Sequence, residues 1–321
     1  MKKEEFLLNS KFDGLPISVL LMWDDRGVPI KGVFELVHGM CEYKERYIPF
    51  MEFIVENGYV CVIHDHRGHG DSIHREDDLG YFYEGGYNAM IEDVMLVRDN
   101  IMGREEFVGL PIHLFGHSMG SMVVRGVVKR YDDKFNSLIV CGSPSYNPLS
   151  GLGVSIASMI SWIKGKRYRS EFVHRLSFGG FKTKTKGLAN KASKMNMTKK
   201  MKMVNSWICS DTSVVKAYNL DHKCHFRFTL NGFVNLFRLM KYVYSPKNWK
   251  LSNLSIPIHF ISGADDACLV SEDKFLKAVD FMRKRGYSNV SSKLYPNMRH
   301  EILNEIGKEE VYVDILNWLG E

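Results

Sequence analysis

A serine between two glycines limits most strongly what this chain can fold into. The pentapeptide Gly116–Gly120, with the sequence Gly-His-Ser-Met-Gly, follows an apolar run over 111–115 and precedes a stretch of helical character that ends near Tyr131. A sharp turn between a strand and a helix crowds backbone against backbone, so the positions two before and two after the serine must be small. The pattern predicts a strand, a tight turn and a helix, with the Ser118 hydroxyl held above the carboxyl end of the strand.

Apolar runs alternate with stretches of helical periodicity on both sides of this pentapeptide. The apolar runs predict strands at 32–37, 59–64, 111–115, 137–141, 256–262 and 291–295. Helical spacing predicts helices at about 44–57, 87–102, 119–131, 230–244 and 271–285, and a last helix that His300 opens and that runs toward Leu319. This alternation is typical of the α/β class, with a mainly parallel, doubly wound sheet flanked by helices.

The composition is that of an ordinary globular enzyme or binding protein. The 321 residues, of which 45% are hydrophobic and 25% charged, suffice for one large α/β domain with an insertion. The six cysteines are scattered and form no C-x-x-C pair, so we expect reduced thiols and a cytoplasmic protein. The first eight residues lack the apolar segment of a signal peptide.

Two loops of the predicted sheet offer amides for an oxyanion hole. The strand at 32–37 runs into His38-Gly39-Met40 and then into a helix, and such a turn leaves backbone amides unbonded. The helix after Ser118 likewise points its first amides toward the hydroxyl, where the helix dipole favours negative charge. We assign the backbone N–H groups of Met40 and Met119 to the oxyanion hole.

An acid and a base follow in the order that a nucleophilic serine requires. The strand at 256–262 ends in Gly263-Ala264-Asp265-Asp266, and a carboxylate on such a loop can orient a histidine. The two neighbouring aspartates point in different directions, and the pattern alone does not choose between them. His300 follows the last strand and is the predicted general base.

A histidine-rich loop invites comparison with a metal site. Residues 64–72 contain three histidines and two aspartates. Alternating His and Gly in a tight loop lacks the helical or strand spacing that aims ligands at one point, so we expect no metal there. A loop braced by buried polar side chains and by Arg67 is the favoured interpretation.

The composition changes in the middle of the chain. Between Lys164 and Lys202 there are thirteen Lys or Arg and one acid, Glu171, a net charge of +12 against +6 for the whole chain. The apolar stretch before it, 152–163, has twelve residues, too few to span a bilayer but enough to lie in its interface. We expect a lid that contacts an anionic membrane surface, with a merely solvated cap as the alternative. No recognition motif supports nucleic-acid binding.

Taken together, these motifs resemble α/β-hydrolases of the monoacylglycerol lipase and lysophospholipase family. The matching residues are His38-Gly39-Met40 with Glu42 and Tyr47, the run 65–72, Gly116–Gly120, 263–266 and His300. The resemblance implies the α/β-hydrolase fold, with a core at 1–145 and 226–321 and an inserted, basic helical cap at 146–225. In that family the acid lies three residues after the glycine of the G-x-x-D turn, which selects Asp266 over Asp265.

The resemblance also implies a function. Ser118, Asp266 and His300 would form a catalytic triad that cleaves carboxylic esters of lipids, a monoacylglycerol or a lysophospholipid, without cofactor or metal. A soluble short-chain carboxylesterase, an aminopeptidase-like amidase and a non-catalytic hydrolase-fold binding protein are the alternatives. Some family members carry a cysteine three residues past the acid, where this chain has Leu269, with Cys268 one position early. No role in the lid and no thiol role is therefore transferred.

Overall fold

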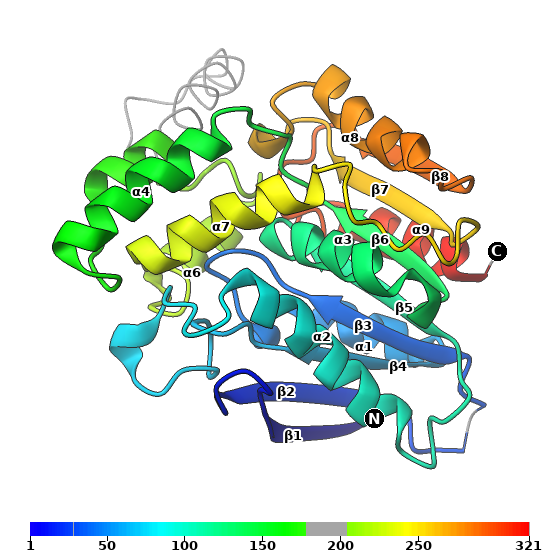
Figure 1. Ribbon diagram of the computed structural model, residues 1–321. Coiled ribbons are helices and arrows are strands. Elements are labelled where there is room, and N and C mark those ends of the chain that lie inside the picture. The colour runs from blue at the N-terminus through cyan, green and yellow to red at the C-terminus, as the bar shows by residue number, and fades with distance from the viewer. Residues whose placement is uncertain (28, 178–203, 321) are drawn as a thin grey trace.

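One mixed β-sheet forms the centre of the molecule (Figure 1). The computed structural model describes residues 1–27, 29–177 and 204–320. Within them the strand order is β1-β2-β4-β3-β5-β6-β7-β8, with β2 antiparallel to both of its neighbours and every other pairing parallel. The strands are β1 (Lys2–Asn9), β2 (Pro16–Trp23), β3 (Gly32–Val37), β4 (Tyr59–His64), β5 (Ile112–His117), β6 (Ser137–Cys141), β7 (Ile258–Gly263) and β8 (Val290–Tyr295).

Helices cover both faces of this sheet, which is why the central strands β3, β4, β5 and β6 are buried along their whole length. One face packs against α2 (Tyr87–Met102), α3 (Met119–Tyr131) and α8 (Glu272–Lys284). The other face packs against α1 (Ile48–Glu56) and α9 (Lys308–Gly320). Along β3 the side chains alternate between the two cores, because successive residues of a strand point to opposite faces. The predicted α/β sheet is confirmed.

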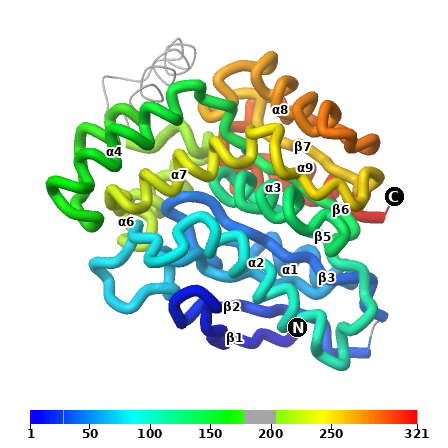
Figure 2. The backbone as a smooth tube through the Cα atoms, viewed as in Figure 1, coloured from blue at the N-terminus to red at the C-terminus, as the bar shows by residue number. Residues whose placement is uncertain are grey.

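The long connection between β6 and β7 adds helices beyond the sheet. It contains α4 (Ser150–Lys164), α6 (Thr212–Leu220) and α7 (Leu230–Val243), and α4 lies alongside α7 in Figures 1 and 2. The close fit depends on Gly153, where a Cβ would lie 3.1 Å from the ring of Phe237. The division into a core and a cap at 146–225 stays a prediction, and residues 178–202 of the basic stretch lie outside the described residues.

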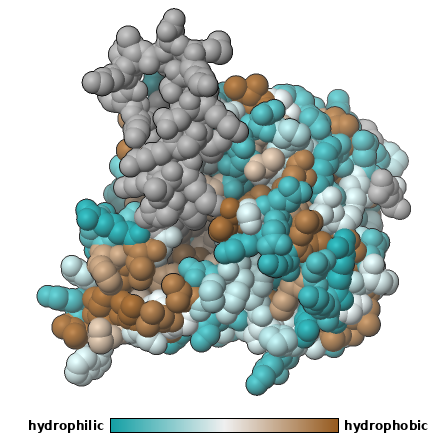
Figure 3. Space-filling model, turned by 90° about the horizontal axis from the view of Figure 1, so that it is seen from above, coloured by the Kyte–Doolittle hydropathy of each residue, from teal (hydrophilic) through white to brown (hydrophobic). Residues whose placement is uncertain are grey.

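The side of α4 that faces away from α7 exposes large apolar side chains. Leu152, Met159, Trp162 and Ile163 are exposed, and Trp162 shows 88% of its surface. Figure 3 shows hydrophobic side chains gathered on the left of the face viewed, the side on which Figure 1 places α4. Among the described residues, no helix has the length and apolar character needed to cross a membrane.

Three elements differ from the sequence prediction. Strands β1 and β2 were not predicted, although they form the antiparallel edge of the sheet. The last helix begins at Lys308 and not at His300, because residues 302–307 form turns that place His300 in a loop. Because His300 lies in a loop and not in a helix, side chains from several elements can position its imidazole.

Substituting Gly120 tests the steric demand of the turn at Ser118. A Cβ at Gly120 would lie 2.2 Å from the carbonyl oxygen of Val37, where backbone cannot move aside. We expect Gly120→Ala to lower the free energy of unfolding by about 3 kcal/mol or to prevent folding. Gly320→Ala, whose Cβ meets nothing within 4 Å, is the matched control. Equal urea midpoints for the two variants would contradict the steric argument.

Candidate active site

Ser118 occupies a strained backbone position between β5 and α3. Its φ of 53° lies in the left-handed region, which residues other than glycine rarely adopt. The turn closes only because its flanking glycines lack side chains: a Cβ at Gly116 would lie 2.5 Å from the carbonyl oxygen of Gly120. The predicted strand, turn and helix are confirmed, and Ser118 is 9% exposed. Strain at a partly accessible serine is typical of a functional site.

His300 and Asp266 form a buried hydrogen-bonded pair close to this turn. Nδ1 of His300 donates to Oδ2 of Asp266 over 2.9 Å, and Asp266 also accepts from the backbone N–H of Cys268 and from the hydroxyl of Ser262. Burial alone would raise the pKa of Asp266, but the charge of His300 and these hydrogen bonds hold it below its ordinary value. The structure thus brings Asp266 to His300, and within the described residues no hydrogen bond joins the carboxylate of Asp265 to the histidine ring.

The carboxyl end of β6 contacts both Ser118 and His300. The backbone N–H of Ser118 donates to the carbonyl oxygen of Cys141 over 2.9 Å. The next residue, Gly142, leaves room for the base, since a Cβ there would lie 3.3 Å from Cε1 of His300. Within the described part of the chain, the Ser118 hydroxyl has no hydrogen-bond partner, so it is available to a base or a substrate.

The loop after β3 passes directly beside the nucleophile. A Cβ at Gly39 would lie 2.9 Å from Cβ of Ser118 and 2.5 Å from a carboxylate oxygen of Glu42. Neither the N–H of Met40 nor that of Met119 donates to an acceptor among the residues that the structure describes. Two amides near one serine without acceptors are what an oxyanion hole requires.

His38 and His66 connect this loop to its neighbour. Nδ1 of His38 donates to the carbonyl oxygen of Gly39, so its Nε2 accepts the backbone N–H of His66 over 2.9 Å. Nε2 of His66 donates back to the carbonyl oxygen of His38 over 3.0 Å. Burial lowers the pKa values of both rings well below the ordinary value, which keeps them neutral. The pair therefore stabilises the loop that carries Met40.

The histidine-rich loop is braced in the way that the sequence indicated. Arg67 is fully buried and bonds to carboxylates of Asp93 and Asp13 and to the carbonyl oxygens of Phe82 and Glu84.

Three carboxylates beside that loop could in principle hold a cation. Oxygens of Glu45, Asp65 and Asp71 cluster there, but the ammonium of Lys44 lies among them, 2.8 to 3.0 Å from each residue. A lysine that already supplies the positive charge leaves no need for a metal ion at this cluster.

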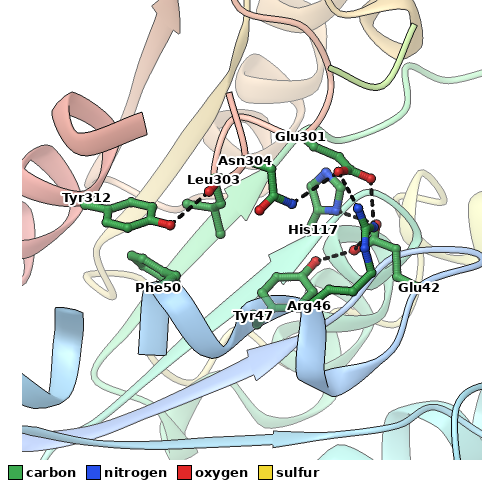
Figure 4. A pocket seen from close by; sticks show the side chains of 9 residues that line it. All are labelled: Glu42, Arg46, Tyr47, Phe50, His117, Glu301, Leu303, Asn304 and Tyr312. Atoms are coloured by element: carbon green, nitrogen blue, oxygen red, sulfur yellow. Dashed lines mark hydrogen bonds and ion pairs between the residues drawn. The ribbon is translucent and has the colours of Figure 1, made fainter. Parts of the chain in front are cut away.

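A second buried network, whose side chains Figure 4 shows, contacts the backbone of His300. His117 is placed between two acceptors: Nδ1 is 2.8 Å from a carboxylate oxygen of Glu42, and Nε2 is 3.2 Å from the carbonyl oxygen of His300. Both nitrogens face acceptors, an arrangement that favours the doubly protonated ring. Burial opposes this charge, but Glu42 raises the pKa of His117 above its ordinary value.

Further polar side chains complete the network. The Tyr47 hydroxyl donates to Glu42 over 2.8 Å, and Arg46 forms a two-pronged ion pair with Glu301 at 2.9 and 2.7 Å. These groups line a cavity of about 10 Å³, room for roughly one water. The sequence did not indicate the pairing of Glu42 with His117, because the two residues lie 75 positions apart and no periodicity connects them.

Known proteins are similar to this chain over most of its length. Residues 28–307 match the family described as serine aminopeptidase, S33. A monoacylglycerol lipase of Mycolicibacterium smegmatis is 23% identical over 295 residues, 90% of this chain and 88% of that protein.

Solved structures share the fold over the full length. A carboxyl esterase from Bacillus coagulans, in complex with glycerol, aligns with a TM-score of 0.84 at 24% identity, covering 100% of this chain and 98% of that one. A soluble variant of monoglyceride lipase from Saccharomyces cerevisiae, in complex with a substrate analogue, aligns with a TM-score of 0.71 at 18% identity, covering 99% and 95%. At these identities the likeness shows the fold alone.

Glu42→Gln tests the buried charge pair through its pH dependence. The pKa of Glu42 is lowered by His117, so its share of the stability is present above its ordinary pKa of 4.5 and lost as the pH falls. The raised pKa of His117 works in the opposite sense: its share is present below 6.5 and lost as the pH rises through the folded value. Both contributions are present between about pH 5 and 6.5.

In that window we expect Glu42→Gln to lower the free energy of unfolding by about 3 kcal/mol, because an uncompensated buried charge remains. The loss should shrink above that window as His117 gives up its proton. Urea unfolding of both proteins at several pH values measures it. Glu76→Gln, on the surface, is the control and should change little. A loss for Glu42→Gln that is the same at every pH would exclude the charged pair.

Proposed function

This chain belongs to the serine aminopeptidase S33 family, and we propose that it is a serine hydrolase that cleaves carboxylic esters of lipids, a monoacylglycerol or a lysophospholipid. One observation carries the proposal: a strained serine at a strand-to-helix turn lies near a buried histidine whose Nδ1 is hydrogen-bonded to a carboxylate at 2.9 Å. Serine, histidine and acid at the carboxyl ends of strands are the parts of a nucleophilic triad.

The proposed reaction is acyl transfer in two halves. His300, oriented by Asp266, takes the proton of Ser118 as Oγ attacks the ester carbonyl carbon. The same proton then goes to the leaving alcohol, and an acyl-enzyme remains. Water, deprotonated by His300, attacks the acyl carbon and releases the acid and the serine. The bond between Nδ1 and Asp266 supports this assignment, because it leaves Nε2 as the nitrogen that exchanges the proton.

The oxyanion of each tetrahedral intermediate would be held by the amides of Met40 and Met119. Gly39 supports this assignment because it lets the loop reach Ser118 closely. Backbone donors on a braced loop need no reorganisation during the reaction, and such a donor is worth about 2.7–4 kcal/mol in the transition state.

The lipid substrate rests on the cap and on the relatives. The relatives from Mycolicibacterium smegmatis and Saccharomyces cerevisiae are described as a monoacylglycerol lipase and a monoglyceride lipase. The exposed apolar side of α4 would lie in a lipid interface, and the basic residues that follow it in the chain would favour anionic headgroups. Each acyl methylene that leaves water contributes about 0.8 kcal/mol to binding.

A soluble carboxylesterase is the second candidate within the same chemistry. The Bacillus coagulans structure, described as a carboxyl esterase, favours it. The family description as an aminopeptidase favours an amidase in the same way. A non-catalytic binding protein is disfavoured, since serine, histidine and acid are all present.

Substitutions in the triad test the mechanism. We expect Ser118→Ala and His300→Ala to lower kcat on p-nitrophenyl butyrate by about 10⁴-fold or more, because the nucleophile or its base is gone. Met40→Ala should stay within about threefold of wild type, because its proposed donor is the backbone amide. Labelling with a fluorophosphonate should require Ser118. Wild-type turnover by Ser118→Ala would end the proposal.

The response to lipid surfaces separates the two candidates. For a lipase we expect p-nitrophenyl ester rates to rise from two to sixteen carbons and to rise further with anionic vesicles. Trp162→Gln should reduce the vesicle effect and leave hydrolysis of the short ester unchanged, because the side chain is exposed on α4. Ile306→Gln, exposed outside the cap, is the matched control. A preference for acetate that vesicles do not change would identify a soluble esterase.

A further inference from the structure

A tryptophan from the connection between β6 and β7 lies against the histidine of the site. The indole of Trp207 has its ring centroid 5.0 Å from that of His300, with the two planes 43° apart. This residue follows the basic stretch in the chain, and no sequence pattern marked it. It lies 93 positions before His300, so only the tertiary structure brings the two rings together.

Hydrogen bonds between the residues that flank the two rings hold the rings next to each other. The backbone N–H of Glu301 donates to the carbonyl oxygen of Ile208 over 2.7 Å. The guanidinium of Arg299 donates to the carbonyl oxygens of Ser206 and Cys209, at 2.5 and 2.9 Å. The neighbours of His300 in the chain therefore bond to the neighbours of Trp207.

A carboxylate fixes the same two segments a second time. Oε1 of Glu305 accepts the backbone N–H of Ser210 and that of Arg299, both over 2.8 Å. One side chain therefore bridges both segments and helps to hold the indole beside the histidine.

We propose, building on the serine hydrolase function above, that Trp207 is a positioning residue whose indole face stabilises the imidazolium form of His300. That cation arises when the proton of Ser118 Oγ passes to Nε2 while the bond from Oγ to the carbonyl carbon forms. A cation within about 6 Å of an indole centroid is attracted by the negative face of the ring, and tryptophan is the strongest partner of this kind.

The other groups around His300 do not supply this stabilisation on the same side. Asp266 faces Nδ1, and Sγ of Cys268 is 4.0 Å from Nε2. The ring of His117 lies 4.7 Å away, and the carboxylate of Glu42 compensates its charge when it is protonated. The acid of Glu301 is engaged by Arg46. Among the described residues, Trp207 brings an uncharged aromatic ring to within 5.0 Å of the base, centroid to centroid.

The test is the pH profile of kcat/KM on a soluble short ester, p-nitrophenyl butyrate, without vesicles. In wild type kcat/KM falls at acid pH, since only the neutral base accepts the serine proton. We expect Trp207→Leu to lower the plateau by roughly 3- to 10-fold and to move the midpoint of the acid limb to lower pH by roughly 0.4 to 1 unit. Trp207→Phe, which keeps an aromatic face, should fall between leucine and wild type.

The direction of the shift discriminates between two roles. If the indole only excluded water, its loss would hydrate and stabilise the imidazolium, and the acid limb would move to higher pH. A limb that stays in place or moves to higher pH, in enzyme that titrates fully with a fluorophosphonate, overturns the proposal. Trp318→Leu is the control. It removes a tryptophan that is stacked on His259, outside the site, with ring centroids 5.3 Å apart, and it should leave the pH profile of kcat/KM unchanged.

If Trp207→Leu does not fold, a second measurement still tests the proposal. Fluorinated tryptophans at position 207 weaken the negative face of the ring while keeping its shape, so the limb should move stepwise with the number of fluorines. No movement across the series overturns the proposal. Full activity of Ser118→Ala would refute the serine mechanism and this inference together. If Ser118→Ala is inactive but the acid limb of the Trp207→Leu profile does not shift, only the role of Trp207 is refuted.

Discussion

The close approach of two backbones at the start of α3 is the constraint on which the rest of the site depends. Gly120 lies so near β3 that a Cβ would meet the carbonyl oxygens of Val37 and His38 at 2.2 and 2.4 Å. This contact presses the helix that follows Ser118 against the strand that precedes Met40. Gly39 in turn touches Ser118 from the other side. The strained serine and both candidate oxyanion amides are therefore fixed by one packing arrangement.

Charge is buried around this arrangement with local compensation. Arg67 is paired with Asp93, Lys44 with Asp65, and the imidazolium of His117 with Glu42, all within 3.0 Å. Such pairs add little net stability, but they orient the loops that carry them. Glu35 on β3 is different, since no described residue bonds to its carboxyl and burial raises its pKa well above the ordinary value. The core thus tolerates an unpaired acid away from the site, while Arg67, Lys44 and His117 beside the site each have a carboxylate partner.

The connection between β6 and β7 contacts the loop of the histidine. Its segment 206–210 is bonded to residues 299–305 at several points, so the loop of the histidine is shared between the sheet and this connection. The rings of His117 and Trp207 both lie against His300, the residue that the sequence predicted as the base. The environment of the base is consequently set in part by this segment.

The sequence by itself determined the parts that depend on local geometry. The glycines at 116 and 120, the helix Tyr87–Met102 and the order of serine, acid and histidine are all legible because sterics and periodicity act over a few residues. The edge strands β1 and β2, the His117–Glu42 pair and the contact of Trp207 with His300 were decided by the tertiary structure. Each joins residues far apart in the chain or needs a neighbouring strand, and such contacts arise only when the sheet brings loop ends together and water is excluded from between them.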